Sequence, residues 1–322
     1  MKQFIIRRLI LSVFILFGVS LIIYTLVRMM PGDYVQNLTA NNPSVTPEMV
    51  QRLRSLYGLD EGIVEGYIKW VGKAVQGNLG DSFIYQKPVT EVISSKIWNS
   101  FALAFTSYFF ELLFAIPLGI FAATRQYSKM DYGVTVFGLI GISLPSFFFA
   151  AILKRIFSVG LKWVPLQGMV TARKDYEGFA LFLDIAWHYI LPIAVLTIIG
   201  IGSTMRYSRT NMLEVLNMDF VRTARAKGLS ESKVIYKHAF RNTLIPIVTM
   251  IGNSLPGLFS GAIITEGIFA IDGIGNAAFV ALAKGDIPFI MGFNILLAVL
   301  TLCGTLLADV LYAAVDPRVR LS

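Results

Sequence analysis

The chain has 322 residues, of which 55% are hydrophobic and 15% are charged, whereas a soluble domain has about 25% charged residues. This composition excludes an ordinary water-soluble protein and indicates an integral membrane protein. The net charge of +8 does not indicate nucleic-acid binding, because basic residues commonly flank membrane spans. The one cysteine, Cys303, lies in an apolar run, which excludes a disulfide within the chain and a cysteine-based metal or redox pair.

Six long segments carry almost no charge, and each predicts a membrane-spanning helix. About 20 apolar residues in a helix cross roughly 30 Å of hydrocarbon, and irregular backbone cannot face lipid. The segments are 9–27, 97–124, 132–153, 185–205, 242–265 and 287–308. Only Glu111 places a charged residue well inside a span. The sequence therefore predicts an all-α integral membrane protein with six transmembrane helices.

The first apolar run, 9–27, follows a basic segment and could be a cleaved signal peptide. It is longer than the roughly 7–15 apolar residues of a signal sequence, and no small-x-small cleavage site follows it. We therefore expect residues 1–30 to be a cytoplasmic N-terminus with a retained first span.

Residues 31–96 predict a small helical segment outside the membrane. In "TPEMVQRLRSLYG", Thr46 is a candidate N-cap, Pro47 a first helical residue and Gly58 a stop signal. A second helix is predicted in "VEGYIKWVGKAVQG", which ends before Gly77. Apolar residues at helical spacing predict one packing stripe on each helix. The stripes are Met49, Leu53 and Leu56 on the first helix, and Tyr67, Trp70, Val71 and Ala74 on the second.

The remaining residues, 97–322, predict a five-helix membrane core with a basic loop at 206–243. An even number of spans places both termini on one side. That side has slightly more basic and far fewer acidic residues in its loops than the opposite side, which predicts that both termini and the loop 206–243 are cytoplasmic.

Residues that could carry out catalysis do not gather in this sequence. It contains no G-x-x-x-x-G-K-[ST] motif that would bind ATP. The two histidines, His188 and His238, are predicted on opposite sides of the membrane, so they cannot share a metal. If chemistry is involved, we expect another subunit to supply it.

The stretch 221–242 predicts two short helices with a turn at 228–232. Gly228 would permit a left-handed or closely approached backbone at this turn, and Ser230 could cap the second helix. Composition alone leaves two interpretations open: a solvated loop that sets the topology, or an element that contacts a partner.

The sequence "DFVRTARAKGLSESKVIYKHAFRN" (219–242) resembles the cytoplasmic coupling loop of ABC-importer permeases, in the version found in B-type permeases for oligopeptides and dipeptides. Arg222 and Thr223 stand where the general motif has Glu-Ala, and Met30 stands where Leu is usual. Lys154 and Arg155 interrupt a region expected to be apolar. Further matches fall in the family's order: "RRLILSVFILFGVSLIIYTLVRMMPGD" (7–33), "LRSLYGLD" (53–60), "GNLGDS" (77–82), "WVPLQG" (163–168), "LPIAVL" (191–196), "TEGIFAIDGIG" (265–275) and "LYAAVDPRVR" (311–320).

The resemblance implies a type I ABC importer permease fold in a bacterial or archaeal cell membrane. It implies a heterodimer with a sister permease, two cytoplasmic ATPase subunits that bind ATP and Mg, and an extracytoplasmic solute-binding protein. This chain would bind no cofactor. Independently of the resemblance, the cost of a charge in hydrocarbon predicts that Glu111 faces the substrate pathway or a polar partner in the sister subunit, or else is protonated. The residues implied to couple the chain to the ATPases are Arg222, Ala224, Arg225, Ala226, Lys227, Gly228, Leu229 and Ser230.

In this interpretation Ala224 and Ala226 allow close approach of a partner's backbone, while Arg222, Arg225 and Lys227 pair with its acidic residues. A permease of the same family for nickel or another small solute is the nearest alternative. An ion-coupled secondary transporter is disfavoured, because it would need paired ionisable residues within the membrane and inverted repeats. A membrane enzyme is disfavoured by the lack of a convergent polar set.

Overall fold

The structure of this chain is a computed structural model that describes residues 2–40 and 45–315. The described residues form helices, and their one β-bridge joins Asp81 to Pro88 outside any strand. They divide into two compact units, one within 1–98 and 273–303 and the other within 99–272 and 304–320. The helices, with two π-helical segments marked η, are α1 (Lys2–Met29), α2 (Tyr34–Thr39), α3 (Pro47–Leu56), α4 (Ile63–Ala74), α5 (Val89–Thr124), α6 (Lys129–Ser143), α7 (Ser146–Leu153), η1 (Lys154–Gly160), α8 (Gly178–Leu216), α9 (Asp219–Ala226), α10 (Glu231–Lys233), η2 (Val234–Ala239), α11 (Phe240–Ser260), α12 (Ile263–Phe269), α13 (Ile274–Lys284) and α14 (Ile287–Val315).

Long apolar helices cover most of the predicted spans. Within the described ranges, α1, α5, α8 and α14 are long and apolar enough to cross a membrane, and up to seven spans result if each bent helix pair is counted as one. Helices are thereby confirmed at 9–27, 97–124, 185–205 and 287–308. Part of the C-terminal motif at 311–320 lies outside the described residues.

The prediction of one helix over 132–153 is wrong, because two helices cover this range. α6 ends at Ser143, and the chain then turns by 104° into the helix that begins at Ser146. The cause is Pro145, which lacks a backbone N–H and disfavours helical geometry at the preceding residue; Leu144 is accordingly extended, with φ −84° and ψ 129°. The predicted helix 242–265 also ends early, at Ser260, because Gly261 has φ +78°.

Lys154, unexpected in an apolar region, has a specific partner. It begins the π-helical segment η1, and its ammonium donates a hydrogen bond of 2.5 Å to the carbonyl oxygen of Ile268 in α12. The same ammonium lies 5.5 Å from the centre of the Phe269 ring. The charge is therefore tolerated because it is paired with a backbone dipole and an aromatic face.

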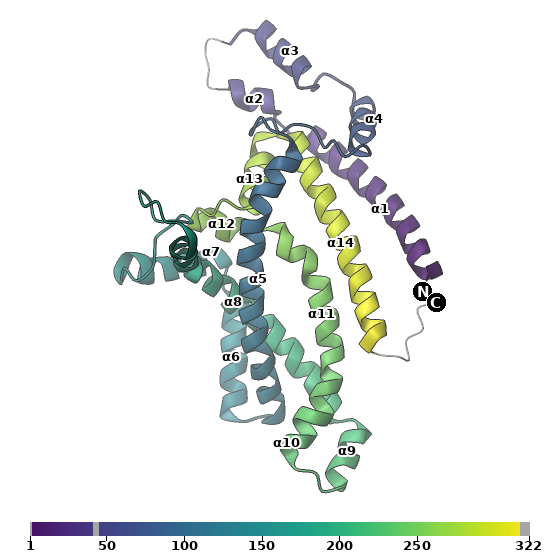
Figure 1. The fold of residues 1–322 in the computed structure, drawn as a ribbon, viewed down its shortest axis with the longest axis vertical. Coiled ribbons are helices and arrows are strands. Elements are labelled where there is room, and N and C mark those ends of the chain that lie inside the picture. The colour runs from purple at the N-terminus through teal and green to yellow at the C-terminus, as the bar shows by residue number, and fades with distance from the viewer. Residues whose placement is uncertain (1, 41–44, 316–322) are drawn as a thin grey trace. The chain divides into compact units, whose positions relative to one another are not determined.

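α6 lies alongside α8 in the second unit (Figure 1), and α5 approaches α8 at Gly119, where a Cβ would overlap the carbonyl oxygen of Met205. α6 and α8 approach closely at glycines: a Cβ at Gly202 would overlap the carbonyl oxygen of Gly138, and one at Gly141 would lie 2.9 Å from the carbonyl oxygen of Ile198. Small residues allow such backbone contact between helices in a membrane, where apolar side chains gain little by leaving lipid.

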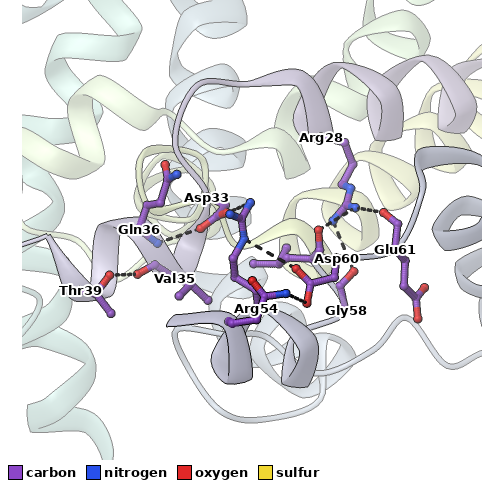
Figure 2. A network of polar contacts seen from close by, with 11 residues as sticks. Arg28, Asp33, Val35, Gln36, Thr39, Arg54, Gly58, Asp60 and Glu61 are labelled. Carbon is purple, nitrogen blue, oxygen red and sulfur yellow. Dashed lines mark hydrogen bonds and ion pairs between the residues drawn. The ribbon is translucent and has the colours of Figure 1, made fainter. Parts of the chain in front are cut away.

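The predicted cap of α3 is confirmed, but its packing stripe is wrong. Thr46 Oγ1 accepts a hydrogen bond of 3.3 Å from the Met49 N–H, with Pro47 as first helical residue. No residue of α3 is buried, however, and Met49 and Leu56 are exposed. Polar contacts hold the helix instead, including an ion pair of 2.8 Å between Arg54 and Asp33 (Figure 2).

The predicted stripe on α4 is confirmed for three of its four residues, Tyr67, Trp70 and Val71. Tyr67 is buried in a cluster with Tyr24 of α1 and Met291 of α14, and Trp70 and Val71 pack against the same cluster. α4 is thus attached to the first span through its aromatic residues.

The motif "GNLGDS" is fixed by a buried acid at the start of α14. Asp286, which is fully buried, accepts hydrogen bonds from Ser82 Oγ at 2.5 Å and from the Ile84 N–H at 3.1 Å. It also accepts one of 3.2 Å from the Phe289 N–H, so the same carboxylate caps α14.

Candidate coupling loop

The candidate coupling loop, residues 219–242, begins with a short amphipathic helix. In α9, Val221 and Ala224 are buried, whereas the other side chains of the helix are exposed. The spacing of three residues places both buried side chains on one face. α9 therefore attaches to its own chain by one face and leaves the opposite, basic face open.

The buried face of the loop packs on the ends of two long helices. Val221, Ala224, Val234 and Ala239 share one apolar cluster with Ile120 and Ala123 of α5 and Met212 and Val215 of α8. Figure 1 places α9 and α10 at the same end of α8 and α11. Since α8 has 39 residues, it is about 58 Å long, which is long enough to reach from this cluster across the full thickness of a membrane.

The turn between the two short helices depends on Gly228. Its φ is +73°, and a Cβ built there would meet no atom within 4 Å. Two roles were predicted for this glycine. The left-handed backbone is confirmed, but no other part of the chain that the structure describes approaches Gly228 closely. Ser230 occupies the N-cap position of α10 as predicted, but its side chain makes no capping hydrogen bond.

Arg225 is paired within the loop. Its guanidinium donates two hydrogen bonds to the carboxylate of Glu231, at 2.7 and 3.2 Å. This hydrogen bonding raises the pKa of Arg225 above its ordinary value. The pair closes the turn from outside, so Arg225 has a structural contact in addition to any that it makes with a partner. Nη1 of Arg222 lies 3.8 Å from Oδ1 of Asp219, and both side chains are largely exposed.

The predicted coupling residues thus separate into an inner and an outer set. Ala224 is buried and Leu229 is half-buried against the apolar cluster, so Ala224 serves contacts within its own chain. The exposed set consists of Arg222, Arg225, Ala226, Lys227, Gly228 and Ser230. This exposed set is the part of the loop that is open to a partner, and Ala226 is its single alanine.

A buried ion pair near the loop was not predicted. Arg209 of α8 donates two hydrogen bonds of 3.0 Å to the two carboxylate oxygens of Asp131 in α6. Asp131 also accepts a hydrogen bond of 3.0 Å from the Tyr127 N–H. The side chain of Asp131 is only 5% exposed. No local pattern could have revealed this pair, because its members lie 78 positions apart in the sequence.

Glu111, the other candidate residue, belongs to α5, and its side chain contacts α8. It is half-buried, and Thr204 of α8 donates a hydrogen bond to its carboxylate. A Cβ at Gly200 would overlap that carboxylate, so glycine makes room for the acid. The described ranges contain no group of three or more His, Cys, Asp or Glu residues that could hold a metal ion.

The chain has long apolar helices joined by a loop that packs on two of them and exposes a basic helix. This combination is typical of a membrane permease subunit. Residues 115–321 match the family of binding-protein-dependent transport system inner membrane components. Residues 1–104 match the N-terminal family of the same membrane components. The chain belongs to this family. It is a multi-pass inner-membrane transport subunit, not an enzyme.

Relatives of known name match over the full chain. The oligopeptide transport system permease protein AppB of Bacillus subtilis (strain 168) is 37% identical over 99% of this chain and 100% of its own length. The di/tripeptide transport system permease protein DppB of Pseudomonas aeruginosa (strain UCBPP-PA14) is 36% identical over 99% of each chain. A chain of the MetNI methionine ABC transporter, solved in inward-facing conformations, has a TM-score of 0.55 and 18% identity, and the match covers 70% of this chain and 97% of that one. At this identity the likeness supports the fold alone, which is that of an ABC importer permease.

Proposed function

We propose that this chain is the transmembrane subunit of an ATP-driven importer that moves oligopeptides or dipeptides into the cytoplasm. The substrate class is supported by the names of relatives that match over the whole chain. The observation that carries the coupling mechanism is α9, which is buried on one face against α5 and α8 and exposed on the other.

In this proposal the chain forms a heterodimer with a sister permease, within the lipid bilayer. Two cytoplasmic ATPase subunits bind ATP and Mg, and an extracytoplasmic solute-binding protein delivers the substrate. Closure of the ATPase pair displaces α9, which contacts both α5 and α8 through one apolar cluster. Because that cluster is closely packed and resists compression, the displacement moves the ends of both spans together. This chain supplies no ATP site and holds no cofactor.

The function is tested by copurification and uptake. We expect affinity purification of the tagged chain from its native membranes to recover a second permease and two ATPase subunits, and reconstituted vesicles with the binding protein to accumulate labelled di- or oligopeptides when ATP is present. ATP-dependent uptake of nickel without peptide uptake would contradict the peptide assignment and favour the small-solute alternative. Uptake driven by an ion gradient without ATP would contradict the ATP-driven mechanism.

The proposed orientation has both termini and the coupling loop in the cytoplasm. In a Cys303→Ser background, a cysteine at Gln76 should react with an impermeant thiol reagent in intact cells. A cysteine at Ser230 should react only after the membrane is permeabilised. Both positions are exposed, so burial cannot explain a difference between them. The reverse pattern would contradict the orientation.

Glu111 is proposed to face the substrate pathway. Glu111→Gln removes the charge, while the amide oxygen can still accept the hydrogen bond from Thr204. We therefore expect unchanged assembly and a selective loss of uptake of cationic peptides relative to neutral ones, measured in competition. An equal effect on both peptide classes would contradict the pathway role and would leave Glu111 as a link between α5 and α8.

A further inference from the structure

α4 has an apolar surface wider than its contact with α1 requires. At 100° per residue, Val64, Ile68 and the C-cap residue Val75, whose backbone is still helical, lie within about 40° of one another, next to the stripe that contains Tyr67 and Val71. The three side chains are 72%, 64% and 83% exposed. Charged residues occupy the opposite side of the helix, where Lys69 forms ion pairs of 2.8 Å with Glu61 and 2.9 Å with Glu65. Such a pattern in a short helix is typical of helices that lie in a membrane interface.

The contacts with α1 give the depth of α4 relative to the membrane. The uncharged run 9–27 is bounded by arginines at both ends and is about 28 Å long, so Arg28 marks one edge of the hydrocarbon. Ser20 lies about 12 Å from Arg28 along the helix. The hydroxyl of Tyr67 lies 2.8 Å from Ser20 Oγ and donates to the carbonyl oxygen of Phe17 at 3.2 Å.

Two further contacts locate the backbone of α4. A Cβ at Gly66 would overlap the hydroxyl of Tyr24, and Tyr24 lies about 6 Å along α1 from Arg28, towards the membrane interior. Arg28 itself donates to the carbonyl oxygens of Leu59 at 3.2 Å and Glu61 at 2.5 Å (Figure 2). The chain therefore meets the edge of the hydrocarbon at 59–61, and α4, which follows directly, lies at or below that edge.

We propose that α4 is embedded in the headgroup–acyl boundary of the leaflet that contains the C-terminal end of α1, with Val64, Ile68 and Val75 in contact with lipid acyl chains. The lipid is favoured as occupant because α4 packs on α1, a predicted span whose Phe17, Leu21 and Ile22 are also exposed. The polar side of α4 remains towards the headgroups and water. Since the inference requires only that α1 crosses the membrane, it does not depend on the identity of the transported substrate.

The proposal is tested with single cysteines in a Cys303→Ser background, in the complex purified with its partners and reconstituted into phosphatidylcholine vesicles. Val64→Cys, Ile68→Cys and Val75→Cys are labelled with the environment-sensitive fluorophore NBD. Gln76→Cys, an exposed polar position in the turn that directly follows α4, is the matched control, and Ile22→Cys on α1 is the lipid-facing reference. All five side chains are exposed, so labelling is not expected to disturb the fold.

We expect the labels at Val64, Ile68 and Val75 to show blue-shifted emission like that at Ile22, and several-fold stronger quenching than the Gln76 label by phospholipids that carry a nitroxide near the headgroup end of the acyl chain. A water-soluble quencher should affect mainly the Gln76 label. Strong quenching by the aqueous agent at all four labelled positions between Val64 and Gln76 would overturn the proposal, because the face would then be open to water. Protection from both quenchers would also overturn it, because a protein surface, of the sister permease or the binding protein, would then cover the face.

Discussion

Replacement of Arg209 by alanine is expected to destabilise the chain by about 3 kcal/mol, because it leaves a buried carboxylate without its charge partner. Asp131 is 5% exposed and receives both hydrogen bonds of the Arg209 guanidinium. Arg209 is 26% exposed, so the loss should be at the lower end of the range of about 3–5 kcal/mol for buried pairs. Because the pair joins α6 to α8, the loss should weaken the packing of those two helices.

The measurement is the temperature at which the purified protein loses its monodisperse peak in size-exclusion chromatography. Arg206→Ala is the matched control, since Arg206 lies one turn earlier on α8 and is exposed; its midpoint should stay close to that of the unmodified protein. A double variant, Asp131→Leu with Arg209→Met, removes both charges and should recover much of the lost stability. An Arg209→Ala protein that melts with the Arg206→Ala protein would contradict the account of this ion pair.

Helix positions with local signals were predictable from the sequence. The cap at Thr46 and the turn at Gly228 each depend on one residue type with a specific backbone preference, and both appear in the structure. The long spans follow from apolar runs alone. These features could be predicted because their causes lie within a few residues.

The bend at Pro145 shows where such reasoning fails. Pro192 lies inside α8 without ending it, whereas Pro145 separates two helices at 104°. Neighbouring helices can satisfy the backbone groups that a proline frees in a membrane, so its effect depends on tertiary contacts. The same holds for Lys154, whose partner Ile268 is 114 positions away in sequence, and for the Asp131–Arg209 pair.

Both apolar stripes were predicted to pack against other helices, but only one of them does. The stripe on α4 contacts α1, while Met49 and Leu56 on α3 are exposed. An amphipathic pattern establishes that a helix has an apolar face, but not that protein covers it. In α4 the apolar face divides into a part that packs on α1 and a part that the structure leaves exposed.

The coupling residues were implied by resemblance, and the structure adds their orientation. Ala224 faces its own chain, Arg225 binds Glu231, and Gly228 has open space around it. Charge reversal at Arg225 would therefore disturb the loop itself. Lys227→Glu is the cleaner change, with an expected effect that is small and weakens at high salt, since exposed ion pairs contribute little.

The largest functional effect is expected from Gly228→Trp. No atom of the chain lies within 4 Å of a Cβ at this position, so the indole finds room in the isolated subunit. The left-handed backbone, with φ +73°, adds a strain of about 1–3 kcal/mol for a residue other than glycine. If the exposed face of the loop fits a groove of the ATPase, the indole blocks that contact while the permease still folds and pairs.

Gly228→Asn separates two possible causes of a loss of activity, the bulk of the indole and the strain of the left-handed backbone. Asparagine tolerates the left-handed conformation better than other side chains and adds little bulk, so the Gly228→Asn complex should keep most of its activity. Gly228→Val has the strain but not the size of an indole, and an intermediate loss is expected. If asparagine were as harmful as tryptophan, any side chain at this position would be harmful and contact with the ATPase would not be the specific cause.

The central claim, that the coupling loop transmits ATP hydrolysis to this permease, is tested most directly by the ATPase activity of the reconstituted complex that carries Gly228→Trp. The measurement compares hydrolysis with and without substrate-loaded binding protein, after the subunit ratio has been determined. We expect the permeases to remain inserted and paired, and the stimulation to be lost or the ATPase subunits to be released. Stimulation equal to that of the unmodified complex, with normal subunit stoichiometry, would contradict the claim.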